Sequence, residues 1–253
     1  MKKIFIIIPI ILALAITVYI GVFYYRHLRG ASTAFFPAPY PIGDAVDNGS
    51  TGPLSVPTGF KIEVFAKDLS GARVIAFDPY GNLWISRTGE GKISVVVVRN
   101  GKAEKTIDVL TGLSNPHGLL FDLAHPNTLY VAEEKKISSV QIAYVEGTTE
   151  PAVLASESMT KLVDLTDDSG IHFSRSLAYT PQGEILVSIG SSCNVCTEDS
   201  GLRASIQKLE HMGEEWKLTP YATGLRNSVF IATNPVDGKI WATEMGRDLL
   251  SSR

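Results

Sequence analysis

Cysteine is scarce in this chain: only two occur among 253 residues, too few for a scaffold held by several disulfides. The phosphate-binding P-loop, the H-E-x-x-H zinc motif and the G-x-S-x-G nucleophile motif are all missing. The 22 glycines and 13 prolines follow no three-residue period, which excludes a collagen-like chain. Because 45% of the residues are hydrophobic and 19% are charged, disorder of the whole chain is excluded and an apolar core is expected.

An excess of positive charge is also missing, since the formal net charge is −3 at pH 7. Residues 1–30 contain basic residues and no acidic one, so the rest of the chain is acidic. These basic residues are Lys2, Lys3, Arg26 and Arg29. The acidic remainder offers no positive field for phosphate groups, and we therefore expect no nucleic-acid partner.

Residues 4–25 form a run without charged side chains. As a helix rising about 1.5 Å per residue, this run would be about 33 Å long, close to the thickness of the bilayer's hydrocarbon core. A secretory signal has a shorter apolar region and a small-residue cleavage site, so residues 1–29 favour an uncleaved membrane anchor over a cleaved signal segment. Residues 30–57 hold five of the prolines and predict a linker.

The two cysteines form the segment Cys193-Asn194-Val195-Cys196. In an exported domain this spacing indicates a short-loop disulfide, and in a cytosolic protein it suggests a redox motif or half a zinc site. There is no second cysteine pair, and Thr197 stands where a haem-attachment motif needs histidine. Cys193 and Cys196 are therefore a candidate disulfide, and the folded domain is expected to be periplasmic or extracellular, held at the membrane by the anchor.

A unit of two short apolar runs around a proline-containing turn recurs four times, at residues 73–86, 116–132, 175–188 and 229–243. The corresponding positions Trp84, Tyr130, Leu186 and Trp241 are 46, 56 and 55 residues apart, near the period of four-stranded propeller blades. The runs are short, rich in Val, Ile and aromatic residues, and bounded by turn formers, as strands are. Residues 58–253 therefore predict an all-β propeller, with a β-sandwich as the alternative.

Only about four blades fit into these residues. An open propeller leaves a strand edge unpaired, which natural proteins avoid. We therefore expect a C-terminally truncated piece of a larger propeller.

Loops that lead into the inner strands of a propeller converge on its central channel, so polar residues there are candidates for function. They are Arg73, His117, His172, Arg175, Arg226 and Asn227. His172 and Arg226 both lie nine residues before the turn proline of their repeat, which predicts one shared face. His172 is the candidate general base because imidazole titrates near neutrality; a histidine bonded to backbone is the alternative. Arg226 is a candidate oxyanion stabiliser oriented by Asn227, or an ordinary surface arginine.

Six motifs, in order, resemble the glucose/sorbosone dehydrogenase family of soluble-type sugar dehydrogenases, which use pyrroloquinoline quinone (PQQ). The motifs are residues 57–66, 115–119, 170–177, 190–196, 224–227 and 241–248. The resemblance implies a six-bladed propeller that holds PQQ in its central cleft, bridged by Ca²⁺. It further implies oxidation of a hydroxyl or aldehyde group of a sugar substrate by hydride transfer to the quinone.

By the same resemblance, His172 would remove the hydroxyl proton, Arg226 would polarise the quinone carbonyl, and Asn227 would hydrogen-bond it. The backbone carbonyls of Gly246 and Arg247 would bind Ca²⁺, in a segment whose mixture of carboxylates and glycine is itself compatible with that ion. His117 would line the cleft near the cofactor.

Two features depart from the family. Ile171 precedes His172 where some relatives have glycine or a carboxylate, and the family's chain continues for about two further blades. The electron acceptor stays open. One alternative is a non-catalytic extracytoplasmic propeller that binds glycan or protein. The other alternative is a Ca²⁺-dependent lactonase-like hydrolase. It ranks last of the three functions because the candidate residues do not form a carboxylate cage around a metal.

Overall fold

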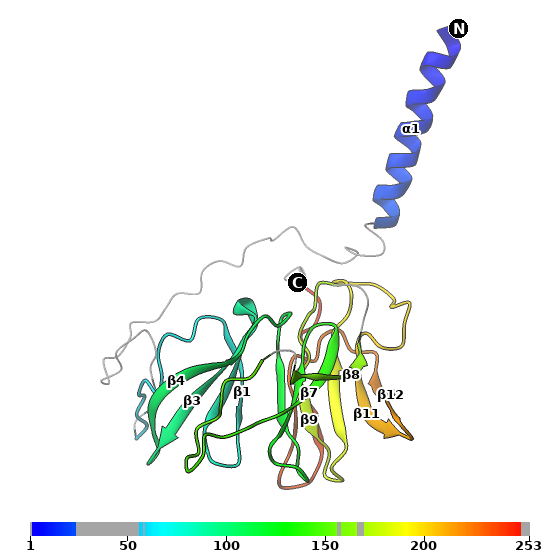
Figure 1. The fold of residues 1–253 in the computed structure, drawn as a ribbon. Coiled ribbons are helices and arrows are strands. Elements are labelled where there is room, and N and C mark those ends of the chain that lie inside the picture. The colour runs from blue at the N-terminus through cyan, green and yellow to red at the C-terminus, as the bar shows by residue number, and fades with distance from the viewer. Residues whose placement is uncertain (1, 24–55, 58, 156–157, 166–169, 249–253) are drawn as a thin grey trace. The chain divides into compact units, whose positions relative to one another are not determined.

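A computed structural model describes the backbone of residues 2–23, 56–57, 59–155, 158–165 and 170–248, and their side chains from residue 12 onward. These residues contain one α-helix, α1, a short 3₁₀ turn at Thr88–Glu90, and strands β1 to β14 (Figure 1). The chain divides into two compact units. One comprises residues 36–165 and 175–177, the other residues 1–35, 166–174 and 178–253.

The helix α1 runs from Lys2 to Phe23. Among the described residues, no helix combines the length and the apolar character that a membrane crossing needs. The structure therefore gives no support to the transmembrane anchor predicted over residues 1–29. The predicted linker at residues 30–57 lies outside the described residues, apart from 56–57.

The unit of residues 36–165 and 175–177 contains two antiparallel four-stranded sheets, each with its strands in chain order. The first consists of β1 (Ala72–Phe77), β2 (Leu83–Arg87), β3 (Lys92–Arg99) and β4 (Lys102–Leu110). The second consists of β5 (Gly118–Phe121), β6 (Thr128–Ala132), β7 (Lys136–Gln141) and β8 (Thr160–Asp164). A cluster of buried side chains, including Trp84, Val95 and Val131, lies in the core of this unit.

A third antiparallel four-stranded sheet begins at residue 177. It consists of β9 (Leu177–Tyr179), β10 (Ile185–Ile189), β11 (Ser205–Met212) and β12 (Glu215–Thr223). A two-stranded sheet of β13 (Ile231–Thr233) and β14 (Ile240–Ala242) follows. Leu186 and Ile206 pack with Ile231 in the core that these two sheets share.

Each of the four sequence repeats forms the first hairpin of a sheet, and the prediction of short strands is confirmed. Trp84, Tyr130 and Leu186 are buried, as core positions of the repeat should be. The corresponding Trp241 is 64% exposed, because its sheet has only two strands among the described residues. The all-β class is confirmed, with sheets of the kind that form propeller blades.

A polar side chain closes the turn of each first hairpin. Asp78, Asp122 and Asn234 accept hydrogen bonds from backbone N–H groups two residues further on, and Thr180 accepts one from the N–H of Glu184. Short polar side chains are favoured at such positions because they replace a backbone acceptor within the turn. The four repeats therefore share the hydrogen bonding of their turns as well as their pattern of apolar residues.

Asp78 makes the most extensive of these turns. Its Oδ1 accepts from the N–H groups of Tyr80 and Asn82, at 3.0 and 2.8 Å. Its Oδ2 accepts from the Asn82 amide, the Trp84 indole and the Tyr144 hydroxyl, at 2.8, 3.1 and 3.2 Å. The carboxylate is buried and is well solvated by these donors.

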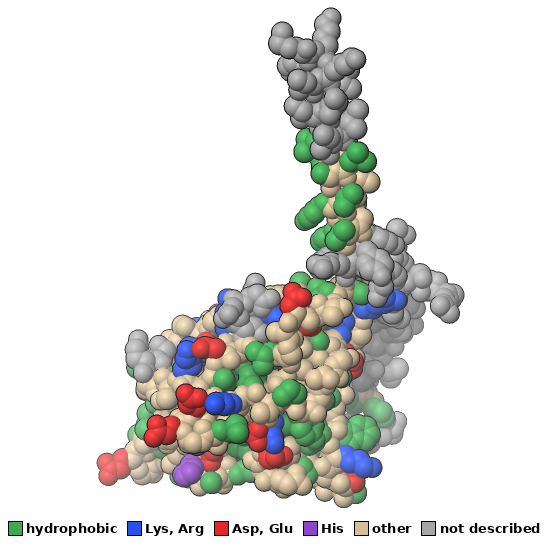
Figure 2. Space-filling view, turned by 90° about the vertical axis from the view of Figure 1, so that its right-hand side faces the viewer, with side chains coloured by type: hydrophobic (Ala, Val, Ile, Leu, Met, Phe, Trp, Pro, Cys, Tyr) green, Lys and Arg blue, Asp and Glu red, His purple; other side chains and the backbone are tan. Residues whose placement is uncertain are grey.

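On the face drawn in Figure 2, basic and acidic side chains are interspersed. Such mixing leaves no continuous positive patch on that face. Elsewhere in the chain, Lys208 of β11 pairs with Glu184, just before β10, at 3.1 Å and with Glu210 of β11 at 2.8 Å.

Candidate cofactor site

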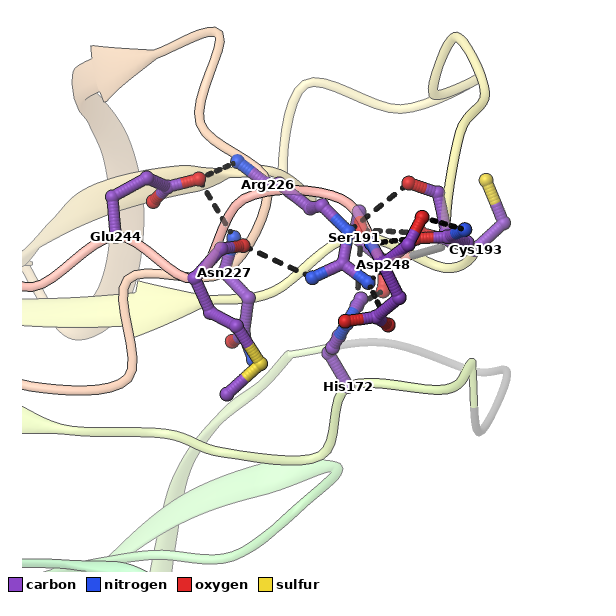
Figure 3. A network of polar contacts seen from close by, with 9 residues as sticks. His172, Ser191, Cys193, Arg226, Asn227, Glu244 and Asp248 are labelled. Carbon is purple, nitrogen blue, oxygen red and sulfur yellow. Dashed lines mark hydrogen bonds and ion pairs between the residues drawn. The ribbon is translucent and has the colours of Figure 1, made fainter. Parts of the chain in front are cut away.

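The candidate residues form two groups. His172, Arg226 and Asn227 belong to one compact unit, where Figure 3 shows them in a single polar network. Arg73, His117 and Arg175 belong to the other unit.

His172 lies in the loop before β9 and is 91% buried, with a side chain turned toward Ser191 (Figure 3). Its Nδ1 lies 2.9 Å from the Ser191 carbonyl oxygen and 3.0 Å from the Ser191 hydroxyl oxygen. That hydroxyl donates its own proton to the Cys193 carbonyl, at 2.7 Å. Because a carbonyl only accepts, Nδ1 carries the ring proton and the lone pair of the neutral imidazole is on Nε2.

Burial lowers the pKa of His172 below its ordinary value of 6.5. The hydrogen bond to the Ser191 carbonyl opposes this shift, the positive charge of Arg226 adds to it, and the carboxylates of Asp248 and Glu198 oppose it. The net lowering keeps the ring neutral at pH 7. A neutral imidazole with a fixed tautomer is the form that a general base needs.

Arg226 precedes β13, and its guanidinium is held by hydrogen bonds within the chain. Nε donates to the Asn194 carbonyl at 3.0 Å, and Nη1 donates to the Met245 carbonyl at 3.0 Å. Nη2 donates to Asn194 Oδ1 at 2.8 Å and pairs with the Asp248 carboxylate at 2.7 Å. These bonds fix the plane of the guanidinium, which contributes positive charge beside His172.

Glu244, just after β14, holds the backbone of the Arg226 loop. Its Oε1 accepts from the N–H groups of Arg226 and Asn227, at 2.5 and 3.1 Å, and its Oε2 accepts from the Ser228 hydroxyl at 3.0 Å. The carboxylate therefore anchors the backbone of both candidate residues from the segment that follows β14.

Asn227 is buried, and its Oδ1 has no hydrogen-bond partner among the described residues. It lies against Gly190, at the end of β10. A Cβ at position 190 would be 2.5 Å from the Cβ of His172 and 2.7 Å from Asn227 Oδ1. Only glycine fits there, and the absence of a side chain brings His172 and Asn227 together. A buried amide oxygen without a partner costs free energy, which makes Asn227 Oδ1 a candidate acceptor for a ligand group.

Cys193 and Cys196 are joined in a disulfide. With Ser191, Asn194, Arg226 and Arg247, among others, they line a cavity of about 310 Å³. Within the described residues, Cys193, Cys196 and Glu198 are the side chains grouped closely enough to hold a metal. Because the two sulfurs are bonded to each other, they are not thiolate ligands. The extracytoplasmic location inferred from this cysteine pair stays a prediction.

Gly246 and Arg247 follow β14 in an exposed segment. The neighbouring Met245 carbonyl accepts from Arg226, and the Met245 N–H donates to the Asn227 carbonyl at 3.0 Å. The segment predicted to bind Ca²⁺ is thus tied to the two candidate cofactor residues, while the ion-binding role of its carbonyls stays a prediction.

His117, in the other unit, is completely buried. Its backbone N–H donates to the Ala132 carbonyl at 2.8 Å, and its Nε2 accepts from Arg73 Nε at 3.3 Å. Arg175, also completely buried, donates from Nε to the Glu134 carbonyl at 2.9 Å. The structure therefore places His117 in an interior polar group, and its assignment to the cofactor stays a prediction.

A family model described as TrAA12-like matches residues 54–253. The chain belongs to the TrAA12-like family. No curated protein sequence matches it significantly.

Solved structures agree with this TrAA12-like assignment in fold. A calcium structure of the carbohydrate-active enzyme family AA12 from Trichoderma reesei is 21% identical, with a TM-score of 0.57 over 73% of this chain and 48% of that chain. The holo PQQ domain of pyranose dehydrogenase from Coprinopsis cinerea is 19% identical, with a TM-score of 0.62 over 77% and 48%. The PQQ-bound aldose sugar dehydrogenase of Streptomyces coelicolor is 20% identical, with a TM-score of 0.55 over 74% and 60%.

The TrAA12-like chain thus spans about half the length of the first two of these structures. The second and third structures are described as PQQ-containing sugar dehydrogenases. Together with the family match, they confirm the resemblance that the six motifs indicate.

Several residues of the TrAA12-like site have no role in the sequence analysis. Ser191 and Asn194 lie inside the 190–196 motif, and Glu244 inside the 241–248 motif, but the motifs by themselves assign them no partner. From the sequence, Glu244 and Asp248 stand only in a segment whose composition is compatible with Ca²⁺. Their clustering within two motifs is the signal that could have indicated them.

The buried His117 makes the stability of the TrAA12-like fold depend on pH. Burial, with the positive charge of Arg73, lowers the pKa of His117 from 6.5 to about 4. Between these values the unfolded chain binds a proton that the folded chain does not, so stability is complete above pH 6.5 and falls toward pH 4. A shift of this size corresponds to about 3 kcal/mol.

Urea denaturation of wild type between pH 7 and 4 should show this loss, and His117→Asn should show a smaller loss over the same range. An equal pH dependence in both proteins would contradict the assignment to His117.

Proposed function

We propose that the protein oxidises a sugar with PQQ as the hydride acceptor. The observation that carries this proposal is the buried neutral His172, with its lone pair on Nε2, beside an Asn227 amide oxygen that lacks a partner. Membership of the TrAA12-like family supports it, as do the PQQ-containing sugar dehydrogenases of similar fold.

The residues present fit the cofactor. The partnerless Oδ1 of Asn227 leaves an acceptor in a buried position, and Gly190, which has no Cβ, allows Asn227 and His172 to lie close together. PQQ is planar and carries carbonyl, carboxylate and N–H groups, so it offers the complementary hydrogen bonds. When bound, it supplies an electrophilic quinone carbonyl that takes up hydride.

His172 would act as the general base. As the carbon–hydrogen bond of the sugar breaks with its electron pair, the hydroxyl proton moves to Nε2 of His172, and a carbonyl product forms. Ser191 holds the ring in the required tautomer through Nδ1. Arg226, oriented by Asn194 and Asp248, would contribute positive charge where negative charge develops, and the Asn227 amide N–H would donate a hydrogen bond there.

We further propose that the backbone carbonyls of Gly246 and Arg247 hold Ca²⁺. Carbonyl oxygens suit this ion, whereas the disulfide-bonded Cys193 and Cys196 do not. The links from Met245 to Arg226 and Asn227 would then place the ion's segment next to the cofactor residues.

The decisive experiment uses the complete protein that contains this chain, prepared without cofactor. We expect dye reduction with aldoses or other pyranoses only after PQQ and Ca²⁺ are both added, and loss of most of the rate after treatment with EDTA. A parallel assay measures lactone hydrolysis and glycan binding without PQQ. Failure of every sugar to support PQQ-dependent dye reduction would refute the proposal, and glycan binding or lactonase activity in that case would favour the corresponding alternative.

A further inference from the structure

Asn194 lies where three separate segments of one compact unit meet. It belongs to the loop that the Cys193–Cys196 disulfide closes. Its carbonyl and its Oδ1 both accept from the Arg226 guanidinium, at 3.0 and 2.8 Å. The same Oδ1 accepts from the Asp248 N–H at 2.9 Å, and the Asn194 amide donates to the Asp248 carbonyl at 3.4 Å. Figure 3 shows Arg226 and Asp248 meeting beside Cys193, the first residue of this loop.

We propose that Asn194 is a positioning residue. The Cys193–Cys196 disulfide gives it this role by holding its loop in place. Asn194 fixes the Arg226 guanidinium and the Met245–Asp248 segment relative to each other. The consequence for cofactor binding rests on the proposed function; the structural consequence does not.

The arrangement depends on the closed loop because two of the acceptors are backbone carbonyls. The Asn194 carbonyl reaches Arg226 Nε, and the Cys193 carbonyl accepts the Ser191 hydroxyl that lies beside His172. A side chain reorients by rotation, but a carbonyl moves only with its loop. The disulfide confines the four-residue loop and thereby holds both carbonyls in place. Its reduction would release the contacts to Arg226 and to Ser191 together.

Side-chain chemistry also favours asparagine at this position. Its oxygen accepts from a cation and from an N–H at once, while its amide donates to a carbonyl. Alanine would remove these side-chain bonds and keep the backbone carbonyl. Aspartate would keep the accepting oxygen and lose the weaker donation to Asp248.

Hydrogen–deuterium exchange on the 253-residue chain, without cofactor, tests the structural part. In Asn194→Ala, exchange of the Asp248 amide should become about tenfold faster, as expected for the loss of its one well-formed hydrogen bond to Asn194 Oδ1. The Asn194→Asp variant should retain most of the protection. Val195→Ala, which changes the same loop without removing any of these bonds, is the matched control and should behave as wild type.

The disulfide has its own test, which does not depend on any variant of Asn194. The Cys193→Ser/Cys196→Ser double variant, and wild type reduced with a phosphine, should both show faster exchange of the Met245–Asp248 segment. Unchanged exchange in all of these proteins, or equal exchange in Asn194→Ala and Val195→Ala, would overturn the proposal. Exchange as fast in Asn194→Asp as in Asn194→Ala would overturn the role of the Oδ1 oxygen.

The functional part is measured as PQQ affinity in the complete protein by absorbance titration. Asn194→Ala should raise the Kd about tenfold, Asn194→Asp should restore it, and the thermal unfolding midpoint should stay at its wild-type value. An unchanged Kd in Asn194→Ala would overturn the link to the cofactor. If wild type binds no PQQ while the exchange results hold, the proposed function fails and the positioning role of Asn194 stands.

Discussion

His172→Gln is expected to lower the turnover of PQQ-dependent sugar oxidation by a factor of about 10² to 10⁴, the usual contribution of a positioned general base. The buried ring offers its Nε2 lone pair because Nδ1 is committed to the Ser191 carbonyl. Glutamine retains a polar side chain of similar reach but has no group that takes up a proton at pH 7. Dye reduction at saturating sugar measures the effect, and PQQ titration of the same variant separates turnover from cofactor binding.

The matched control is His125→Gln, because the His125 side chain is 79% exposed and lies in the other compact unit. Its turnover should equal that of wild type. Turnover of His172→Gln within twofold of wild type, with PQQ bound, would remove His172 from the role of base.

The pH profile follows from the same site. Since burial lowers the pKa of His172 below 6.5, the base stays unprotonated throughout the neutral range. Turnover should therefore be constant near pH 7 and decline only at pH values below 6.5, as His172 takes up a proton. A decline that begins above pH 7 would contradict a lowered pKa.

Asp78→Ala is expected to reduce the free energy of unfolding by about 3–5 kcal/mol, a large share of the stability of an ordinary domain. The substitution removes the acceptor of the buried Trp84 indole and of the half-buried Tyr144 hydroxyl. It also removes one of the two acceptors of the buried Asn82 amide, which keeps its bond to the Thr149 carbonyl. Each buried donor left in this way costs about 1–3 kcal/mol, although relaxation makes the costs less than additive.

Denaturation with urea measures this loss. Asp199→Ala, at an exposed position, is the control and should change stability by less than about 0.5 kcal/mol. The m-value should be the same in both variants and wild type if each remains compact and unfolds in two states. A loss below about 1 kcal/mol for Asp78→Ala would show that water or rearranged side chains satisfy the donors, and that Asp78 is not a principal anchor of the hairpin.

The strands could be predicted because their signals are local. An apolar run of four to six residues, a proline or glycine turn and a polar residue before that turn recur in every repeat, and each forms a hairpin through bonds within a few residues. The turn of Asp78 and that of Asp122 use the same Asx geometry. By contrast, the burial of Trp84 and the exposure of Trp241 depend on how many strands join each sheet, which the hairpin motif does not specify.

The all-β class, the hairpin positions, the family resemblance and the candidates His172, Arg226 and Asn227 could thus be predicted from the amino-acid sequence alone. The folded chain was needed to show that Ser191 fixes the His172 tautomer, that Asn194 and Glu244 hold Arg226 and its loop, and that His117 is completely buried. The difference lies in distance along the chain. Hairpins form between neighbours in sequence, whereas the site joins residues 172, 191, 194, 226 and 244, and such contacts exist only once the sheets have folded.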